Sequence, residues 1–163
     1  MSGITHALGF EPVYDSESKV LILGSFPSVK SRAVGFYYGN PQNRFWKMLC
    51  GYFGEEIPPD PAGKTEFLLR RKIALWDVVE ECDIVGSSDA SIRGEAVADV
   101  PALIARTKVK AILCNGTKSY TVIVERFPQL LSITKKLPST SPANPRYDAS
   151  AWMAALDEVF EKV

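Results

Sequence analysis

Four short apolar runs rich in Val, Ile and Leu limit the folds that this chain can adopt. Runs of this length without strict alternation of apolar and polar residues favour strands that are covered on both faces, as in a parallel sheet. The runs are residues 20–23, residues 73–75 with a continuation to Val78 and Val79, residues 109–113, and residues 131–137. They predict four buried strands.

Stretches with helical periodicity separate these runs. The helices are expected to begin after Asn40 as N-cap, to cover residues 99–106, to begin after Asn115 or Thr117, and to begin after Asp148. Because strand and helix alternate, the most economical fold is an open α/β sandwich with right-handed crossovers.

Composition narrows the class of protein. With 163 residues, 46% of them hydrophobic, the chain can bury roughly two-thirds of its unfolded surface around one core. We therefore expect a single domain over residues 1–163. The formal net charge is 0, which excludes a strong overall basic excess but leaves local basic patches open.

The chain offers few groups for metal or cofactor chemistry. Its three cysteines form no CxxC pair and it has one histidine, His6, so we expect no metal site, no disulfide framework and no histidine-based triad. No GxGxxG or P-loop sequence follows the first apolar run, and we expect no cofactor. Reduced cysteines and the lack of an apolar run near the roughly 20 residues that span a bilayer predict a cytoplasmic protein with no membrane partner.

In an open α/β sheet, ligands bind beyond the carboxyl ends of the strands. The turns expected there are residues 24–28, the stretch from Asp77 onward, residues 115–117 and residues 138–144. These turns are the first places to look for functional side chains.

The stretch FYYGNPQNRFW at residues 36–46 combines aromatic rings with polar side chains. If Asn40 caps the helix, Asn43 lies in its first turn, where a carboxamide can hold a water molecule and meet developing negative charge. The alternative is that Asn43 only bonds a neighbouring backbone group. The rings of Phe36, Tyr37 and Tyr38 could stack on a base.

Two further stretches could either bind a ligand or have an ordinary structural role. Asp77 follows ALW and precedes VVEEC, so it could accept a hydrogen bond from a ligand N–H, or it could cap a loop or pair with an arginine. LPSTSPANP at residues 137–145 is either a stiff loop suited to insertion into a groove or an ordinary turn.

GSFPS at residues 24–28 with Ser31, followed by FYYGNPQNRFW, resembles the hypoxanthine-DNA glycosylase branch of the uracil-DNA glycosylase superfamily. The chain is also similar to the mismatch-specific uracil-DNA glycosylases, which share the PxNRFW stretch. The resemblance implies a three-layer α/β/α sandwich with a central four-stranded, mainly parallel sheet. It also implies a monomer that acts on double-stranded DNA containing a deaminated base.

The resemblance assigns roles to individual positions. It implies that Asn43 is catalytic. The implied base-binding residues are Phe26, Tyr37, Tyr38 and Asp77, and the implied DNA-binding residues are Ser28, Ser31, Pro138, Ser139, Thr140, Ser141 and Pro142.

Two departures from the superfamily pattern bear on the substrate. Phe26 stands where many relatives carry a catalytic Asp or Asn, and Leu137 stands where the late motif begins with histidine. The resemblance therefore implies excision of hypoxanthine rather than efficient removal of uracil. Specificity for uracil, xanthine or a mismatched base remains open, as does a noncatalytic α/β module that binds nucleic acid or a nucleotide.

Overall fold

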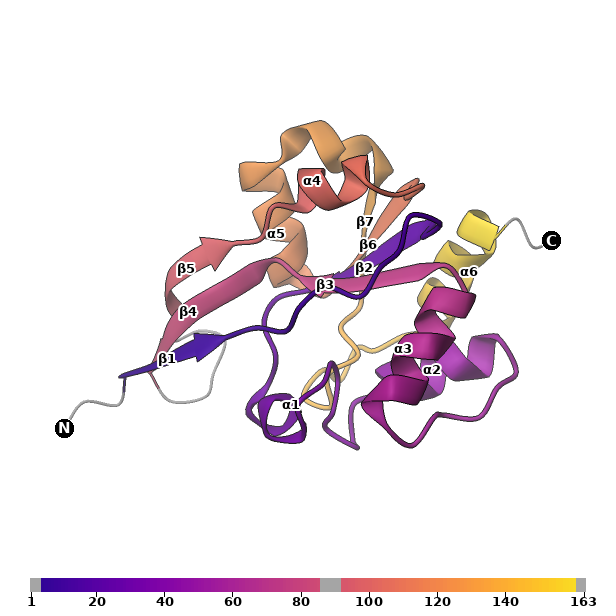
Figure 1. The fold of residues 1–163 in the computed structure, drawn as a ribbon, viewed down its shortest axis with the longest axis horizontal. Helices are drawn as coiled ribbons and strands as arrows, with labels where there is room; N and C mark the ends of the chain where they lie inside the picture. Colours follow the sequence, from indigo (N-terminus) through magenta and orange to yellow (C-terminus); the bar gives the residue numbers. More distant parts are fainter. Residues whose placement is uncertain (1–3, 86–91, 161–163) are drawn as a thin grey trace.

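The computed structural model describes residues 4–85 and 92–160 of the chain. At its centre lies a four-stranded sheet in which every pair of neighbouring strands is parallel (Figure 1). Its strands, in spatial order, are β3 (Ile73–Asp77), β2 (Val20–Gly24), β6 (Ala111–Asn115) and β7 (Thr134–Leu137). The predicted four-stranded parallel sheet is confirmed.

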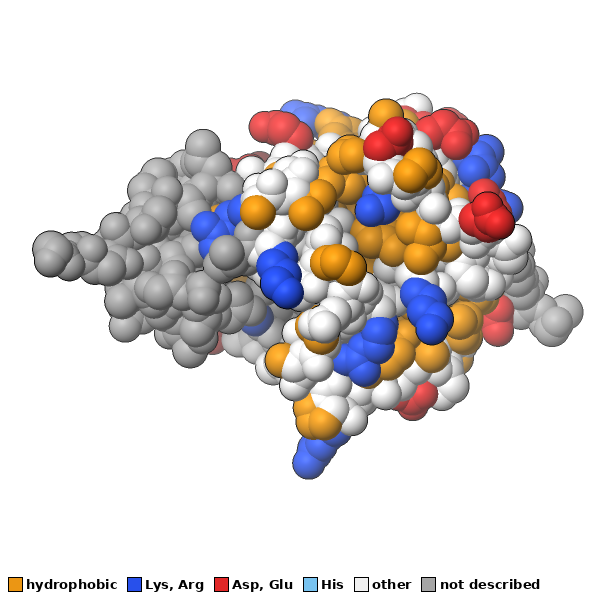
Figure 2. Space-filling view, turned by 90° about the horizontal axis from the view of Figure 1, so that it is seen from below, with side chains coloured by type: hydrophobic (Ala, Val, Ile, Leu, Met, Phe, Trp, Pro, Cys, Tyr) orange, Lys and Arg blue, Asp and Glu red, His pale blue; other side chains and the backbone are white. Residues whose placement is uncertain are grey.

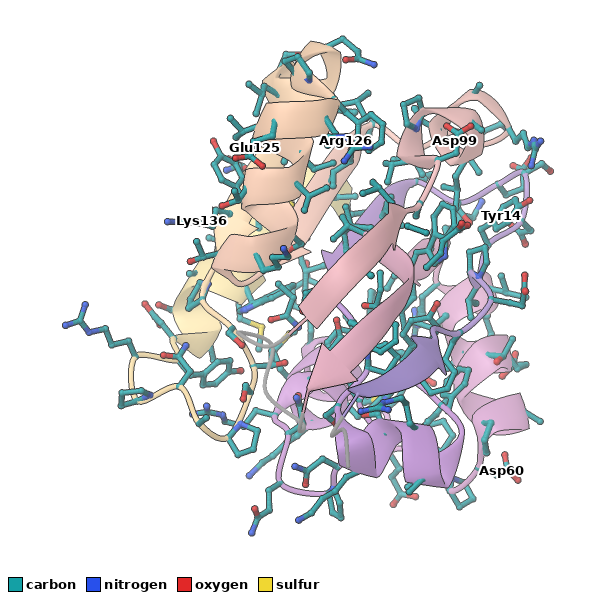
Figure 3. All side chains as sticks on the ribbon, turned by 90° about the vertical axis from the view of Figure 1, so that its left-hand side faces the viewer. Tyr14, Asp60, Asp99, Glu125, Arg126 and Lys136 are labelled. Carbon is teal, nitrogen blue, oxygen red and sulfur yellow. The ribbon has the colours of Figure 1, made fainter. Side chains whose placement is uncertain are left out.

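Helices cover both faces of this sheet. Val20 and Ile22 face one layer, formed by α2 (Phe45–Tyr52), α3 (Pro61–Arg70) and α6 (Ala149–Phe160). Leu21 and Leu23 face the other layer, formed by α4 (Val100–Ala105) and α5 (Thr117–Arg126). Polar side chains of α5 such as Glu125 and Arg126 are exposed (Figure 3). The predicted three-layer α/β/α sandwich is thus confirmed.

A second, antiparallel sheet was not predicted from the sequence. Its order is β1 (Ile4–Leu8), β4 (Val79–Val85) and β5 (Ile92–Val97), and it extends from one side of the sandwich (Figure 1). The backbone N–H of Val78 donates to the Gly24 carbonyl at 2.8 Å and that of Val79 donates to the Ser25 carbonyl at 3.1 Å. These bonds extend the contact between the ends of β2 and β3, which fixes the backbone around Asp77.

Two predicted helix caps are wrong. Helix α2 begins at Phe45 with Arg44 as N-cap, because Asn40 instead closes a turn in which its Oδ1 accepts from the Gln42 N–H at 3.0 Å. Asn43 therefore precedes the helix. The N-cap of α5 is Gly116, neither Asn115 nor Thr117, and Gly116 has φ of 95°, a left-handed conformation that favours glycine.

The other helix and strand boundaries agree in part with those predicted from the sequence. Helix α4 has Asp99 as N-cap, with its side chain accepting from the Ala102 N–H at 3.1 Å, and α6 directly follows Asp148. Residues 131–133 are not strand, because they complete the 3-10 helix η2 (Pro128–Ile133) before β7. The short helix α1 (Val29–Val34) and helix α3 were not predicted. None of the described helices is long and apolar enough to cross a membrane.

Candidate active site at the carboxyl ends of the strands

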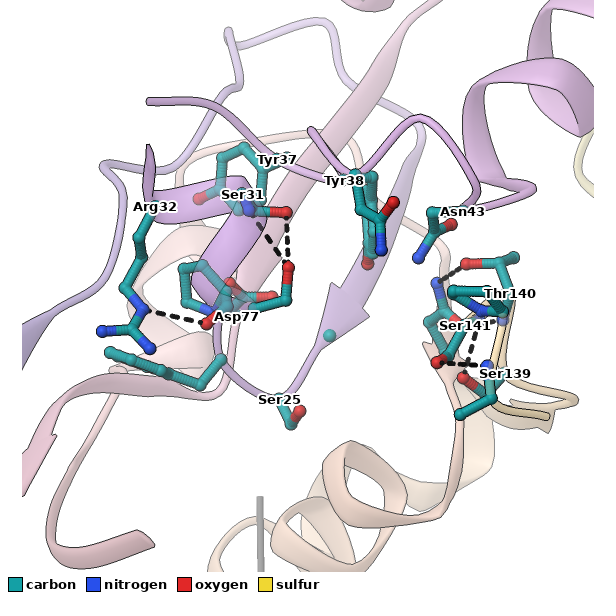
Figure 4. Close-up of a pocket in the computed structure, with 18 residues that line it drawn as sticks. Ser25, Ser31, Arg32, Tyr37, Tyr38, Asn43, Asp77, Ser139, Thr140 and Ser141 are labelled. Carbon is teal, nitrogen blue, oxygen red and sulfur yellow. Dashed lines mark hydrogen bonds between the residues drawn. The ribbon is translucent and has the colours of Figure 1, made fainter. Parts of the chain in front are cut away.

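A cavity of about 370 Å³ opens where β2, β3 and β6 end (Figure 4). Strand β2 leads to α2 and α3 on one face of the sheet, whereas its neighbour β6 leads to α5 on the other face. The connections therefore diverge at this point, which is where open α/β sheets bind ligands. The lining residues come from four parts of the chain: the first motif with α1 (residues 24–34), the aromatic stretch (residues 36–46), the ends of the strands, and the late loop (residues 138–145). They are Gly24, Ser25, Phe26, Pro27, Ser28, Ser31, Arg32, Tyr37, Tyr38, Asn40, Asn43, Asp77, Asn115, Ser139, Thr140, Ser141, Pro142 and Ala143. The fold therefore brings together nearly all of the predicted site residues.

The innermost part of the cavity depends on the absence of a side chain at Gly24. Gly24 is paired in register with Asp77, whose side chain is only 5% exposed. A Cβ on Gly24 would contact the Asp77 Oδ1 and would lie 2.8 Å from the Tyr38 hydroxyl oxygen. Real Cβ atoms do not approach polar atoms this closely, so only glycine lets Asp77 and Tyr38 converge here.

Tyr38 is held in an unusual conformation beside this floor. Its φ is 52°, uncommon for a residue other than glycine, and its ring stacks on Phe45 with centroids 4.2 Å apart. The hydroxyl is buried, with no hydrogen-bond partner among the described residues. Burial, followed by the nearby charge of Asp77, raises the pKa of Tyr38 well above its ordinary value. The cavity thus contains a neutral phenol with unused hydrogen-bonding capacity.

Tyr37 lines the same cavity but directs its hydroxyl elsewhere. The hydroxyl donates to the Glu11 carbonyl at 2.9 Å and approaches the Phe10 carbonyl at 3.2 Å. The Tyr37 carbonyl in turn accepts from the Trp46 indole N–H at 3.0 Å. These contacts anchor the aromatic stretch to the segment before β2, so Tyr37 supports the wall of the cavity.

Asn43 lies between Tyr38 and Thr140 at the opening (Figure 4). Its Oδ1 accepts from the backbone N–H of Phe45 at 2.9 Å. Asn43 therefore does bond a neighbouring backbone group, as the alternative to a catalytic role supposed. A carboxamide oxygen has a second lone pair, and its nitrogen has two protons. In the described part of the chain no hydrogen bond holds that nitrogen, so Asn43 can both stabilise the start of α2 and bind a ligand or water molecule.

The first motif is tied to the aromatic stretch through two serines. Ser28 is the N-cap of α1, and its Oγ accepts from the Ser31 N–H at 3.1 Å. The Ser31 Oγ accepts from the Gly39 N–H at 2.9 Å, and Ser31 is only 3% exposed. Both residues line the cavity, while their bonds position Tyr38 relative to the end of β2.

Phe26 closes the cavity beside α1. It is largely buried, and the Arg32 guanidinium carbon lies 5.7 Å from the centre of its ring. The Arg32 Nε also donates to the Pro27 carbonyl at 3.3 Å. Phe26 therefore supplies an apolar wall with a cation at its outer side, an arrangement suited to a flat ring.

The late loop forms the opposite wall. Ser139, Thr140, Ser141 and Pro142 line the cavity, whereas Pro138 does not. The Pro138 carbonyl accepts from the Trp152 indole N–H at 2.8 Å, so Pro138 anchors the loop to α6. The loop is thereby fixed at its start and its middle part faces the cavity.

Several lining residues were assigned no role from the sequence, although some lie in turns that were expected to bind ligands; Asn115, in the turn at residues 115–117, is the most important. Asn115 ends β6 and points at the late loop, where its Oδ1 accepts from the Thr140 N–H at 2.9 Å. A polar residue at the end of an apolar run was the signal that selected Asp77, and it holds for Asn115 too. Arg32 offered no comparable signal, because its place in the cavity depends on the folded loops.

The charge of this side of the molecule suits a polyanion. Seen from the side on which α1 lies, basic side chains stand across the middle of the surface, whereas acidic ones lie mostly near its margins (Figure 2). In the described ranges, no group of three or more His, Cys, Asp and Glu side chains is arranged to hold a metal ion.

Comparisons with known proteins agree with this architecture. The chain is 37% identical over 155 residues to the hypoxanthine DNA glycosylase of Methanosarcina acetivorans, covering 90% of this chain and 95% of the relative. It is 37% identical over 143 residues to the hypoxanthine DNA glycosylase of Methanosarcina barkeri, covering 85% and 88%.

A solved structure supports the same assignment. The solution NMR structure of a candidate uracil DNA glycosylase from Methanosarcina acetivorans superposes with a TM-score of 0.81 at 34% identity, covering 96% of this chain and 99% of the other. Residues 11–161 match the family described as the uracil DNA glycosylase superfamily. With its parallel sheet, its cavity at the strand ends and these relatives, the chain belongs to the uracil DNA glycosylase superfamily.

Proposed function

We propose that this protein is a monofunctional DNA glycosylase that excises hypoxanthine, the product of adenine deamination, from double-stranded DNA. The observation that carries the proposal is the convergence of Asn43, Tyr38 and Asp77 on one cavity in a chain 37% identical over 90% of its length to a hypoxanthine DNA glycosylase. The cavity volume lies within the range of about 300–1,000 Å³ typical of small-molecule sites.

Access to the base requires that the nucleotide leave the duplex. Extrusion costs a few kcal/mol and is easier where base pairing is weakened, as it is for a deaminated base. Ser139, Ser141 and Pro142 would hold the opened minor groove, whereas Thr140, which was expected to bind DNA as well, is fully buried and fixes this loop to Asn115. Ser28 and Ser31 are proposed to contribute on the other side of the cavity, where Ser28 is exposed and Ser31 acts through the turn that it stabilises.

Inside the cavity, the base is proposed to lie against Phe26 and the aromatic stretch. The ring N–H of hypoxanthine would donate to the Asp77 carboxylate, and the Tyr38 hydroxyl would meet a second polar atom of the base. Support comes from the burial of both groups beside Gly24. A buried hydroxyl such as that of Tyr38 is costly to leave unpaired, so a site of this kind disfavours bases that cannot bond it.

Asn43 is proposed to position the attacking water against C1′ of an oxocarbenium-like sugar. The C1′–N9 bond breaks with its electron pair on the base, the water oxygen bonds C1′, and the water proton passes to the departing base. The products are free hypoxanthine and an abasic site. No lysine is among the residues lining the cavity, which supports a mechanism without a Schiff-base intermediate and hence without direct strand cleavage.

We further propose that residues 1–163 act as one monomeric domain in the cytoplasm, without a cofactor. Sedimentation velocity with and without a duplex would test the monomer. A chelator should leave the yield of excision unchanged.

The substrate is tested with duplexes that each carry one hypoxanthine, uracil, xanthine or normal adenine. After incubation with the protein, alkali converts abasic sites to strand breaks that are separated by length. We expect breaks with hypoxanthine, few with uracil and none with adenine, and no breaks before alkali. Gln42→Ala, an exposed neighbour of Asn43 outside the cavity, is a matched control that should behave as wild type.

Two other outcomes would contradict the proposed activity or its specificity. Breaks from uracil alone would contradict the proposed specificity. Retention of duplex binding without excision of any base would favour the noncatalytic binding module.

A further inference from the structure

Arg44 joins the aromatic stretch to the late loop through an unusual number of contacts. Its Nη2 donates to the carbonyls of Asn144, at 2.9 Å, and Ser141, and its Nε approaches the Thr140 carbonyl at 3.4 Å. Its guanidinium carbon also lies 4.3 Å from the centre of the Tyr147 ring. One side chain thus holds three carbonyls and one ring of the segment that follows β7.

The backbone of Arg44 takes part in the same junction. Its N–H donates to the Thr140 carbonyl at 3.1 Å, and Thr140 is itself fully buried. Asn144 reinforces the loop internally, because its Nδ2 donates to the Ser139 carbonyl at 2.9 Å. The late loop is therefore a closed turn that is fastened to the chain at Arg44.

We propose that Arg44 is a positioning residue for base excision, which holds Asn43 at a fixed distance from the loop that faces the DNA; this inference rests on the proposed function. Asn43 immediately precedes Arg44, so any shift between α2 and the late loop moves Asn43 relative to the sugar of the extruded nucleotide. A misplacement of about 1 Å can slow a reaction about 10²-fold.

The contacts distinguish this role from simple attraction of DNA. A guanidinium that contacts phosphate keeps its donors directed to solvent, whereas the Nε and Nη2 donors of Arg44 are engaged by the carbonyls of Thr140, Ser141 and Asn144. The planar fork and its stack on Tyr147 also favour arginine over lysine, because an ammonium group on a flexible stem reproduces neither.

The first test measures single-turnover excision of hypoxanthine together with duplex affinity. We expect Arg44→Ala to slow the bond-breaking step about 10²-fold, with little change in the dissociation constant of a non-hydrolysable duplex. Arg44→Lys should remain at least about fivefold slower than wild type. Arg146→Ala removes an exposed arginine from the same segment and should keep the wild-type rate at saturating protein.

A double mutant separates positioning from general structural damage. If Arg44 acts through Asn43, the variant Asn43→Ala/Arg44→Ala should excise within about threefold of Asn43→Ala alone, because the two residues then act as a unit. The proposal would be overturned if the rate loss of the double variant equalled the product of the losses of the two single variants, because the two residues would then act independently. A loss confined to duplex affinity would overturn it as well, because it would make Arg44 a DNA contact.

Hydrogen exchange tests the clamp without any reference to activity. The backbone amides of Thr140, Ser141 and Asn144 should exchange at least about tenfold faster in Arg44→Ala, and faster in Arg44→Lys, than in Arg146→Ala. Unchanged exchange would overturn the proposal even if excision is found. If the wild-type protein excises no base, the proposed function fails, and exchange alone decides whether Arg44 holds the loop.

Discussion

Asn115 and Thr140 are joined by two hydrogen bonds. The Asn115 Oδ1 accepts from the Thr140 backbone N–H at 2.9 Å, and its Nδ2 donates to the Thr140 Oγ1 at 3.0 Å. Thr140 is fully buried, so its backbone N–H and its hydroxyl both depend on the Asn115 side chain for a hydrogen bond. The end of β6 is thereby fixed to the loop that forms one wall of the cavity.

Asn115→Ala should lower the free energy of unfolding by about 2 kcal/mol, because it leaves a buried N–H and a buried hydroxyl without their partner. Urea denaturation measures the loss, with an unchanged slope as a check on two-state behaviour. Gln129→Ala removes an exposed amide and serves as the control. Equal stability of both variants would show that Thr140 finds other partners.

Gly24→Ala should abolish excision while the protein remains folded. The added methyl group would clash with the Asp77 carboxylate and the Tyr38 hydroxyl, so both groups must shift and the innermost part of the cavity is lost. The measurement is the single-turnover rate with a hypoxanthine duplex, together with the circular dichroism of the variant. A wild-type rate would place the base away from Gly24.

Gly51→Ala is the matched control for that substitution. Gly51 lies within α2, and a Cβ there would meet no atom within 4 Å. Replacing an exposed helical glycine by alanine should raise the stability by about 0.5–1 kcal/mol. Excision by Gly51→Ala should equal that of wild type.

Tyr38→Phe should leave the free energy of unfolding unchanged or raise it by up to about 1 kcal/mol, because the buried hydroxyl has no hydrogen bond of good geometry in the described part of the chain, although the Asn115 side chain lies near it. If the hydroxyl bonds the base, the same variant should excise hypoxanthine more slowly. Urea denaturation and the excision assay together give both quantities. A destabilised variant would reveal a partner that the free protein provides.

The pH dependence of stability tests the surroundings of Tyr38 independently. Burial and Asp77 raise its pKa above the ordinary value of 10.0, so the folded protein keeps the phenol proton where the unfolded chain loses it. This contribution is complete below pH 10 and declines as the pH rises further, by up to about 1.36 kcal/mol per pH unit. Above pH 10 the free energy of unfolding of Tyr38→Phe should therefore fall less steeply with pH than that of wild type. Parallel curves of stability against pH would contradict the raised pKa of Tyr38.

The sheet and the position of the site followed from local patterns. The runs that begin at Val20 and Ile73 are apolar throughout, which is the pattern of strands buried on both faces, and the site lies where such strands end. The antiparallel sheet was missed because β4 has charged residues in an irregular pattern and pairs with a strand from the beginning of the chain. Pairing of this kind depends on partners distant in sequence.

Local side-chain bonding also misled the prediction of helix starts. Asn40 has the character of an N-cap, yet its side chain closes a turn and Asn43 bonds the first residue of α2. The role of Asn115 depends on Thr140, which lies 25 residues further along the chain. The contacts of Arg44 with residues 140–144 are of the same long-range kind, and only the folded chain reveals them.

If Asn43 positions the attacking water, its removal should slow the bond-breaking step and leave DNA binding intact. The rate of hypoxanthine release is followed under single-turnover conditions for wild type and for Asn43→Ala, with duplex affinity measured in parallel. We expect Asn43→Ala to lose about 10²–10³-fold in rate, with duplex affinity nearly unchanged. Excision at the wild-type rate by Asn43→Ala would show that another group positions the water.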